Sequence, residues 1–579
     1  MISHQIGTAT VLLITFLLEN CNAFLSLSPS PYKNVIHHQI QSVNTFIQPQ
    51  IIDLTRKYHY LSSKSALLAV EYEKDIESDS DEDSHDVSLS NENVGKAILS
   101  LAIPALASLA IDPLMTLADT AFIGRTADDS SALAGVGSAA ALLTFSFYIF
   151  NFLCTVTTPL VSKKRAAKDT AGALEVGSQA LSLAIILGFM LSIVLIAFSQ
   201  PLLLVMGTGS TGLEANTYAT SFLTIRALAA PAVFVSSAST GILRGYLDTK
   251  TSLVLIAAAN VINFILDVIL IGVLHMGPTG AAIATTTAEW LCALYFMFVL
   301  AGKAPSADGK LGNNQQYRKG FQPETSYTQL DGPEFLVVTP TLVLPPWGNI
   351  KPLIVAASSV FVRSFMLQLS IAGAAVAAAR SSDSIGTITE HSASASIAAH
   401  QIALQIWLLC SFICDALAAA SQTLVADGLG KSDQTGVRNV SRKIFTYSIF
   451  LGIVLVGCLE LGEISGVLLD FFTTDEATQA ALKPLLAILI FAQPLNSFVF
   501  AADGVIQGAS EFEFQAKSMI LSASVAMVSF FVLHHLGDPS DSLKYIWYSL
   551  VILQVMRGIT SLIKLVDKEG PIDLLGKKI

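Results

Sequence analysis

Charged residues are scarce in this chain of 579 residues. Asp, Glu, Lys and Arg together make up 13% of it, against about 25% in an ordinary soluble domain. Apolar residues make up 52%, and the mean hydropathy is +0.60. A surface so poor in charge must largely face lipid, which excludes a soluble enzyme. The net charge of −11 also argues against nucleic acid as a partner. Membrane lipid is therefore the expected surroundings.

Several motifs that would indicate an enzyme or a metal site are absent. The six cysteines form no CxxC pair and no Cys/His spacing of a zinc site, so we interpret them as packing thiols. The histidines form neither HExxH nor a His-x4-Asp pattern, which disfavours a membrane acyltransferase. We therefore expect no enzymatic activity, no cofactor and no tightly bound metal.

The amino terminus has the composition of a targeting region. Residues 1–23 contain a short apolar core, "VLLITFLL", followed by the small residue Ala23, which predicts a signal peptide. The next stretch, up to Val70, is base-rich and acid-poor, as in a transit peptide. The junction "AFLSLSP" resembles the bipartite presequence of algae with secondary plastids. This pattern predicts the plastid envelope; an ordinary secretory signal, leading to the plasma or vacuolar membrane, is the alternative.

A strongly acidic run follows, with ten acids and one base between Glu71 and Glu92. Such a run is typical of a solvated, disordered segment. We therefore assign residues 24–95 to a transit peptide plus this acidic segment, outside the packed fold.

Twelve apolar segments follow, each long enough to cross about 30 Å of hydrocarbon. They predict an all-α membrane protein with an amino-terminal half (96–302), a linking loop (303–350), a carboxy-terminal half (351–566) and a tail (567–579). The segments are 98–123, 131–161, 175–205, 217–241, 252–275, 279–301, 352–379, 394–426, 441–466, 482–503, 515–536 and 543–565.

The basic residues support this count. With the amino terminus on the cis side, the loops and tail on that side hold twenty Lys and Arg, whereas the trans loops hold four. Such an asymmetry is the usual mark of membrane orientation, and it places both ends of the helical region on the cis side.

The two halves repeat each other. "ALAGVGSAAALLTF" (132–145) aligns with "SIAAHQIALQIWLL" (396–409) at an offset of 264, and "GILRGYLD" (241–248) aligns with "GVIQGASE" (504–511) at 263. Six helices per repeat give both halves the same orientation. The sequence therefore predicts two pseudo-symmetric six-helix lobes around a central cavity, as in alternating-access transporters.

Polar residues interrupt the apolar segments of the amino-terminal half. A carboxylate at the centre of a membrane helix costs about 2.5–3.5 kcal/mol and indicates function by default. The spacings place these polar residues on one face each of the first, fifth and sixth predicted helices. Clustered acids with amide and hydroxyl partners suit a proton or a sodium ion. These residues are Asp112, Asp119, Asn260, Asn263, Asp267, Thr285 and Glu289.

Four stretches resemble the multidrug and toxic compound extrusion (MATE) family, and most of all its DinF-type branch, which includes plant plastid-envelope members. They are "DPLMTLADTAFIGR", "RGYLDTKTSL", "NVINFILDVILI" and "AAHQIALQIW…DALAAASQTLVA". The resemblance implies a monomeric exporter of a small organic solute, driven by an inward flow of protons or sodium. It also implies a coupling site, which falls on Asp119, Asn263, Asp267 and Thr285.

The sequence departs from this pattern on the sixth helix, where Glu289 replaces an expected uncharged residue and adds a titrating group. In the carboxy-terminal half, the seventh helix carries Arg363 and no acid before Asp383. That half offers three other polar candidates, which are His400, Asp415 and Asp503. For His400 we expect a structural hydrogen bond.

Two other classes of membrane transporter share part of this sequence pattern. A major-facilitator transporter also has two six-helix halves, but "SKKRAAKDTAG" lacks the Gly-x-x-x-Asp-Arg core of that class. A flippase for lipids or lipid-linked substrates, from the same superfamily, is the remaining alternative to solute export.

Overall fold

The computed structural model describes most of the chain from Asn91 onward. The described ranges are 91–126, 130–206, 214–304, 338–339, 347–383, 390–473, 475–536, 541–568 and 570–574. The side chains of 112–134 and of 379–394 lie outside the described part. The predicted signal and transit peptides fall before it.

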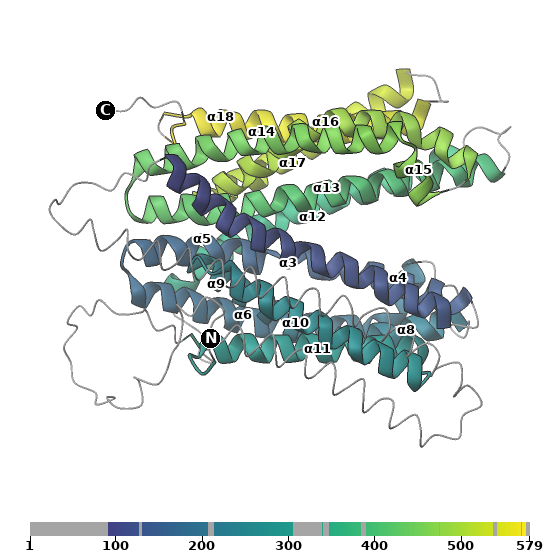
Figure 1. Ribbon diagram of the computed structural model, residues 1–579, viewed down its shortest axis with the longest axis horizontal. Helices are drawn as coiled ribbons and strands as arrows, with labels where there is room; N and C mark the ends of the chain where they lie inside the picture. The colour runs from purple at the N-terminus through teal and green to yellow at the C-terminus, as the bar shows by residue number, and fades with distance from the viewer. Residues whose placement is uncertain are drawn as a thin grey trace, which may run out of the picture. The chain divides into compact units, whose positions relative to one another are not determined.

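The amino-terminal half consists of six membrane crossings, several of them built from two helices (Figure 1). The elements are α3 (Asn91–Thr126), α4 (Ser130–Ile149), α5 (Phe152–Ala166), α6 (Thr170–Ala197), α7 (Ser199–Val205), α8 (Glu214–Ala227), α9 (Ala230–Gly245), α10 (Thr249–Asp267), the π-helix η1 (Val268–Val273) and α11 (Gly277–Leu300).

The carboxy-terminal half follows the same plan with fewer breaks. Its elements are α12 (Trp347–Asp383), α13 (Glu390–Gly430), α14 (Gln434–Ile464), α15 (Val467–Phe472), α16 (Glu476–Gly508), α17 (Phe512–Leu536) and α18 (Ser542–Val566). Within the described ranges every regular element is a helix, which confirms the predicted fold class.

Among the described residues, eleven helical stretches are long and apolar enough to span a membrane, and the bent pair α8–α9, taken as one span, makes a twelfth. This number agrees with the twelve segments predicted from hydropathy. Large apolar side chains on the outer helix faces are widely exposed, for example Ile193 (67%), Phe450 (66%) and Ile563 (66%). In water such a surface would aggregate, whereas in a bilayer it faces lipid.

Close helix contacts recur in both halves and make the repeat visible in three dimensions. A Cβ atom on Gly188 of α6 would lie 2.4 Å from the Cα atom of Pro231 in α9. A Cβ atom on Gly452 of α14 would lie 2.5 Å from the Cα atom of Pro494 in α16. The same backbone-to-backbone approach therefore joins equivalent helices in both halves, and only glycine permits it.

The turns between equivalent helices also match. The side chains of Asp169 and Asp433 cap α6 and α14 by accepting hydrogen bonds from the backbone N–H groups of Gly172 and Gly436, at 2.9 and 2.7 Å. Hydrogen bonds from the Lys164 side chain and from that N–H of Gly172 hold the pKa of Asp169 below its usual value. The caps therefore begin α6 and α14 at equivalent positions of the two halves.

Two long helices connect the halves. The first turns of α3 pack against the carboxy-terminal half, because Val94, Ile98 and Leu101 share a buried cluster with α13, α14 and α16. Farther along, α3 contacts α10 and α11. In Figure 1, α3 runs obliquely from the upper to the lower group of helices. The first helix of the repeat thus touches both halves.

The second connecting helix, α12, opens the carboxy-terminal half in the same way. Its first turns, with Leu353 and Val360, belong to a buried cluster of the amino-terminal half. Its later residues Ala374 and Ala378 pack in the carboxy-terminal half. A movement of one half relative to the other must therefore shift both α3 and α12.

The packed fold extends beyond the predicted boundaries. Val94 is 3% exposed, so the segment expected to remain outside the fold ends before it. In the linking loop, Val338 is buried against the amino-terminal half, and its N–H bonds the carbonyl of Leu300 at 2.8 Å. In the tail, Ile572 is buried, and Asp573 pairs with Arg438 at 2.9 Å.

We predict that Gly188→Ala and Gly452→Ala destabilise the protein to a similar extent. Each added methyl group meets a proline backbone that cannot move aside, at a cost of about 1–3 kcal/mol. Gly457→Ala, five residues farther along α14, is the control, because nothing lies within 4 Å of its Cβ position. Thermal unfolding in detergent checks this. A Gly452→Ala protein that melts no lower than the Gly457→Ala protein would contradict it.

Candidate ion and solute sites

The fifth membrane crossing buries an amide and a carboxylate side chain deep in the protein. Asn263 is 3% exposed and Asp267 is 0% exposed, one turn apart on α10. The polar face predicted from their spacing therefore points into the protein. Asn260, on the same face, is half-buried, and its amide donates to the carbonyl of Ile256 at 2.9 Å. Asn263 Oδ1 is sealed from solvent and has no hydrogen-bond partner in the described part.

The helix changes its winding directly after Asp267. Residues 268–273 form the π-helix η1, in which the N–H of Leu274 bonds the carbonyl of Ile269 at 2.9 Å. A π-helix shifts the side chains that follow it relative to an ideal α-helix and frequently marks a functional site. The sequence contains no proline here, so hydropathy could not predict this break.

The other predicted coupling residues lie on neighbouring helices. Thr285 of α11 is half-buried and bonds the carbonyl of Ala281 at 2.9 Å. Helices α3 and α11 both pack directly on α10. Asp119 and Asp112 belong to α3, but their side chains lie outside the described residues. The structure therefore brings together the three helices that carry the predicted site.

The acid expected to be an additional titrating group has a partner. Both carboxylate oxygens of Glu289 accept hydrogen bonds from Arg226 of α8, Oε1 from Nη2 at 2.9 Å. The side chains are 12% and 25% exposed. Such a bidentate pair fixes α8 to α11, which favours a structural role for Glu289. The signal for it was Arg226, an intramembrane base that the sequence analysis overlooked.

The same helix α11 also holds the bend between α8 and α9. The helices meet at 46° around residues 228–229. Trp290 Nε1 donates to the carbonyl of Leu228 at 3.1 Å, and Thr286 Oγ1 donates to that of Ile225 at 3.3 Å. Broken helices can exist in a membrane only when freed carbonyls find donors, and α11 supplies them.

In the carboxy-terminal half, intramembrane charges form a network. Asp503 of α16 accepts hydrogen bonds from Arg363 of α12, at 2.5 Å, and from Arg557 of α18. Gln515 of α17 also donates to Asp503 Oδ1 at 3.2 Å. Arg363 and Asp503 were each predicted from the sequence as separate polar residues, whereas Arg557 was not predicted. The position of an acid between two bases from different helices was not evident from spacing.

His400 is buried (1% exposed), but the expected structural hydrogen bond is not present. Neither ring nitrogen has a partner in the described part of the chain. Instead, the imidazole packs edge-on against Trp547, with 5.9 Å between ring centroids. It therefore serves as a packing side chain within an apolar cluster. The remaining candidate, Asp415, is half-buried on α13.

The cis ends of α5 and α13 are bonded to each other. Arg165 of α5 pairs with Asp427 of α13 at 2.5 Å, and Lys431 pairs with the same carboxylate at 2.7 Å. Ser162 Oγ donates to the carbonyl of Thr423 at 3.1 Å. Because α5 and α13 belong to opposite halves, the bonds of Arg165 and Ser162 join the halves on the cis side, whereas Lys431 pairs within its own half.

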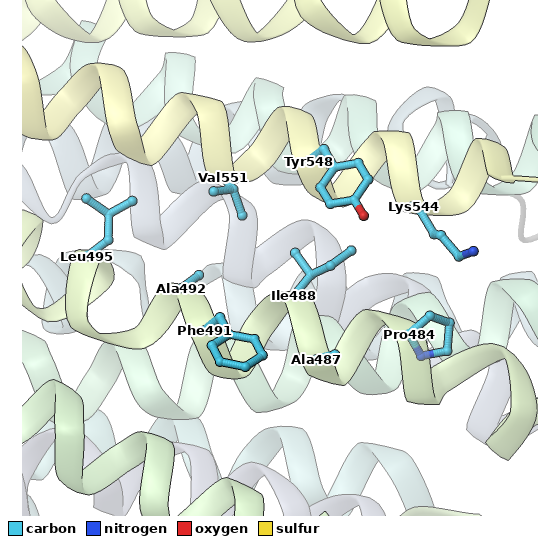
Figure 2. Close-up of a pocket in the computed structure, with 9 residues that line it drawn as sticks. All are labelled: Pro484, Ala487, Ile488, Phe491, Ala492, Leu495, Lys544, Tyr548 and Val551. Atoms are coloured by element: carbon cyan, nitrogen blue, oxygen red, sulfur yellow. The ribbon is translucent and has the colours of Figure 1, made fainter. Parts of the chain in front are cut away.

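A groove of about 630 Å³ lies between α16 and α18 (Figure 2). Most of its lining is apolar, and Phe491 at its edge is 77% exposed. The basic residue at one end, Lys544, pairs with Asp541 at 2.7 Å. Tyr548 adds a hydroxyl to the lining. Because the rest of the lining is mostly apolar, the groove suits an acyl chain better than an ion.

Two repeated halves of membrane-spanning helices, joined at the cis side and carrying buried polar residues, define a multi-pass helical membrane transporter. A solved structure described as an outward-facing multidrug resistance MATE family transporter has the same fold. It matches with a TM-score of 0.65 and 20% identity over 81% of this chain and 94% of that one.

Sequence comparison assigns the family. The MatE family model matches residues 104–269 and 384–532. The chain therefore belongs to the MATE family of multidrug and toxin efflux transporters, as the sequence motifs predicted, and it is not an enzyme.

Similar proteins include Protein DETOXIFICATION 44, chloroplastic, of Arabidopsis thaliana, at 29% identity over 83% of this chain and 84% of that protein. Another is DNA damage-inducible protein F of Escherichia coli, at 26% over 80% and 90% respectively. The comparisons give no support to the lipid flippase alternative.

We predict that Glu289→Gln destabilises the protein by about 1–3 kcal/mol, less than a fully buried pair would lose, because both side chains are partly exposed. Exchanging the two charges, in Arg226→Glu with Glu289→Arg, should recover part of the loss. Melting temperatures in detergent check this. If Glu289→Gln kept full stability but changed the preferred coupling ion, the assignment of Glu289 as structural would be overturned.

Proposed function

We propose that this transporter exports a small organic solute in exchange for protons or sodium ions, with the ion bound at Asp119, Asn263, Asp267 and Thr285. The observation that carries the proposal is the complete burial of Asp267, one turn from a buried Asn263 and directly before a π-helix. A carboxylate kept in such a place is expensive and indicates function by default.

The ion would act by changing the charge of this site. A protonated carboxylic acid is neutral and packs easily in a closed amino-terminal half. An ionised one is costly there, and favours a state in which water or a cation reaches it. Carbonyl, hydroxyl and carboxylate oxygens, as found on Asn263, Thr285 and Asp267, are also the ligands that a hard cation takes. Asp119 and Asp267 would titrate as a coupled pair.

The cis contact supports alternating access as the transport cycle. The bonds of Arg165 and Ser162 tie the halves together at the cis ends of α5 and α13. A state open to the cis side requires these bonds to break. Ion binding can drive that change only through a difference in affinity between the two states.

We also propose residence in the plastid envelope. The support comes from the presequence pattern of residues 1–70 and from the chloroplast location in the names of two Arabidopsis relatives. The tail and the cis loops, rich in Lys and Arg, would then lie on one side of that membrane.

We predict that Asp119→Asn and Asp267→Asn each reduce gradient-driven transport at least tenfold while leaving the melting temperature nearly unchanged. The amide keeps the volume but cannot change charge. Purified protein in liposomes should be given separate pH and sodium gradients, with the fluxes of an organic cation (ethidium) and of an aromatic acid (4-hydroxybenzoate) measured.

Asp112→Asn is the matched control on the same helix, and it should do less harm. Full solute exchange by Asp119→Asn under either gradient would show that Asp119 is structural and that the coupling mechanism is wrong.

For localisation, we predict that a fluorescent protein fused to the carboxy terminus labels the plastid envelope. Deleting residues 2–23 should abolish that label, because entry through the signal peptide is lost. Microscopy with an envelope marker decides the matter. A plasma-membrane or vacuolar signal from the full chain would refute the plastid assignment.

A further inference from the structure

The groove between α16 and α18 has no role in the proposed ion coupling, and it lies on a lipid-facing surface (Figure 2). The side chains of Phe491 and Tyr548, which line it, are 77% and 43% exposed. The same face of α18 continues with Ile559 and Ile563, which are 48% and 66% exposed. A surface this apolar belongs in the hydrocarbon of the bilayer. The molecules that reach the groove are therefore membrane lipids.

The length of the groove corresponds to one leaflet. Its lining on α16 runs from Pro484 to Leu495, which at 1.5 Å per residue is about 16 Å. The whole hydrocarbon core is about 30 Å thick. Both helices begin on the trans side in the orientation that the basic residues predict. The groove therefore leads from near the trans surface toward the middle of the membrane.

The lining changes from polar to apolar along that direction. Lys544, in the first turn of α18, lies at the trans end, and the hydroxyl of Tyr548 follows one turn deeper. Beyond them the lining consists of side chains such as Ile488, Val551 and Leu495. Lysine and tyrosine are typical of the membrane interface, where their polar ends meet headgroups. The order of the lining is that of a phospholipid, headgroup first and acyl chain below.

The charges at the trans end come as a pair of opposite sign. Lys544 Nζ lies 2.7 Å from Asp541 Oδ1, and the two side chains are 37% and 41% exposed. Asp541 is the residue before α18, and its side chain does not cap that helix. An anionic headgroup would be attracted by Lys544 but repelled by Asp541. A zwitterionic headgroup offers a phosphate to Lys544 and an ammonium to Asp541, so both its charges are matched.

We propose that this groove binds one zwitterionic phospholipid of the trans leaflet. Lys544 contacts its phosphate, Asp541 contacts its ammonium group, and Tyr548 donates a hydrogen bond to an oxygen of the headgroup or glycerol ester. One acyl chain lies between α16 and α18. This lipid is a bound partner of the protein, distinct from the transported solute and from the coupling ion.

The headgroup determines which lipid is bound. An acyl chain gains little by leaving other chains for the groove, since both surroundings are equally apolar. Filling the groove restores dispersion contacts, but any lipid with a similar chain does so. Selectivity must therefore come from the Lys544–Asp541 pair. Because an exposed ion pair contributes modestly, we expect a preference of about threefold.

Native mass spectrometry of the purified full-length protein tests this directly. The protein is incubated in detergent with equal amounts of phosphatidylethanolamine and phosphatidylglycerol that have identical acyl chains, and the retained lipid is identified by its mass. The native protein should retain one lipid, with about threefold more phosphatidylethanolamine than phosphatidylglycerol. Asp541→Asn leaves the positive charge alone and should shift the preference to phosphatidylglycerol. Lys544→Gln should reduce retention of both lipids.

A second pair of variants tests the acyl-chain part of the groove. Ala487 and Ala492 line it, the first exposed and the second half-buried. Replacing both by Leu fills the space and should abolish lipid retention. Ala197→Leu is the control, because Ala197 is also exposed, at the trans end of α6, away from the groove. It should leave retention unchanged.

The matched control for the charges is Glu513→Gln, which breaks another exposed pair, with Lys517 on α17. It should leave the lipid preference unchanged. Equal retention of both lipids by the native protein overturns the proposal, as does an Asp541→Asn protein with the native preference. Lipid retained by the filled groove overturns it as well. If the filled-groove variant does not fold, Asp541→Asn and Lys544→Gln carry the test.

Discussion

The structure depends on one constraint: inside a membrane, each buried charge and each freed backbone group must be satisfied by the protein itself. This constraint explains where the charged residues lie. Arg226 and Glu289 neutralise each other between α8 and α11, and α11 also supplies donors for the carbonyls freed at the bend between α8 and α9. The charge network around Asp503 joins α12, α16 and α18 in the same way. These bonds join helices of the same half to one another.

The repeat determines how the halves can move. Equivalent glycines bring α6 against α9 and α14 against α16, which gives both halves the same internal packing. The boundary is different, because the bonds across it are not repeated. Arg165 meets Asp427 on the cis side, whereas the residue equivalent to Arg165 in the other half is Leu429. The glycine contacts within each half are thus duplicated, whereas the Arg165–Asp427 pair between the halves is single. The buried carboxylate of α10 lies next to α3, the helix that touches both halves. A charge change there is well placed to affect the boundary.

Much of the fold could be predicted from the sequence, because its long apolar runs indicate the membrane helices and the repeat at an offset of 264 indicates the two halves. The breaks within helices were not predicted. The π-helix after Asp267 has no proline within it to mark it. The bend at residues 228–229 lies just before Pro231, in the first turn of α9, a signal that the sequence does contain. For the site, spacing correctly placed Asn263 and Asp267 on a buried face. It did not reveal that Glu289 has a partner 63 residues away, since pairing between helices depends on their three-dimensional arrangement. His400 was expected to form a hydrogen bond, yet its neighbour is the ring of Trp547.

The central claim is that the charge state of the buried carboxylates biases the two halves between conformations. The most direct test is the distance between spin labels on Lys163 and Lys431, at the cis ends of α5 and α13, after the exposed Cys458 is replaced by Ser. Double electron–electron resonance should measure this distance in liposomes across a range of pH and of sodium concentration. The account predicts that pH or sodium shifts the distance distribution of the otherwise native protein, and that Asp267→Asn remains in one distribution under all conditions. An Asp267→Asn protein whose distances respond as the native ones do would contradict it.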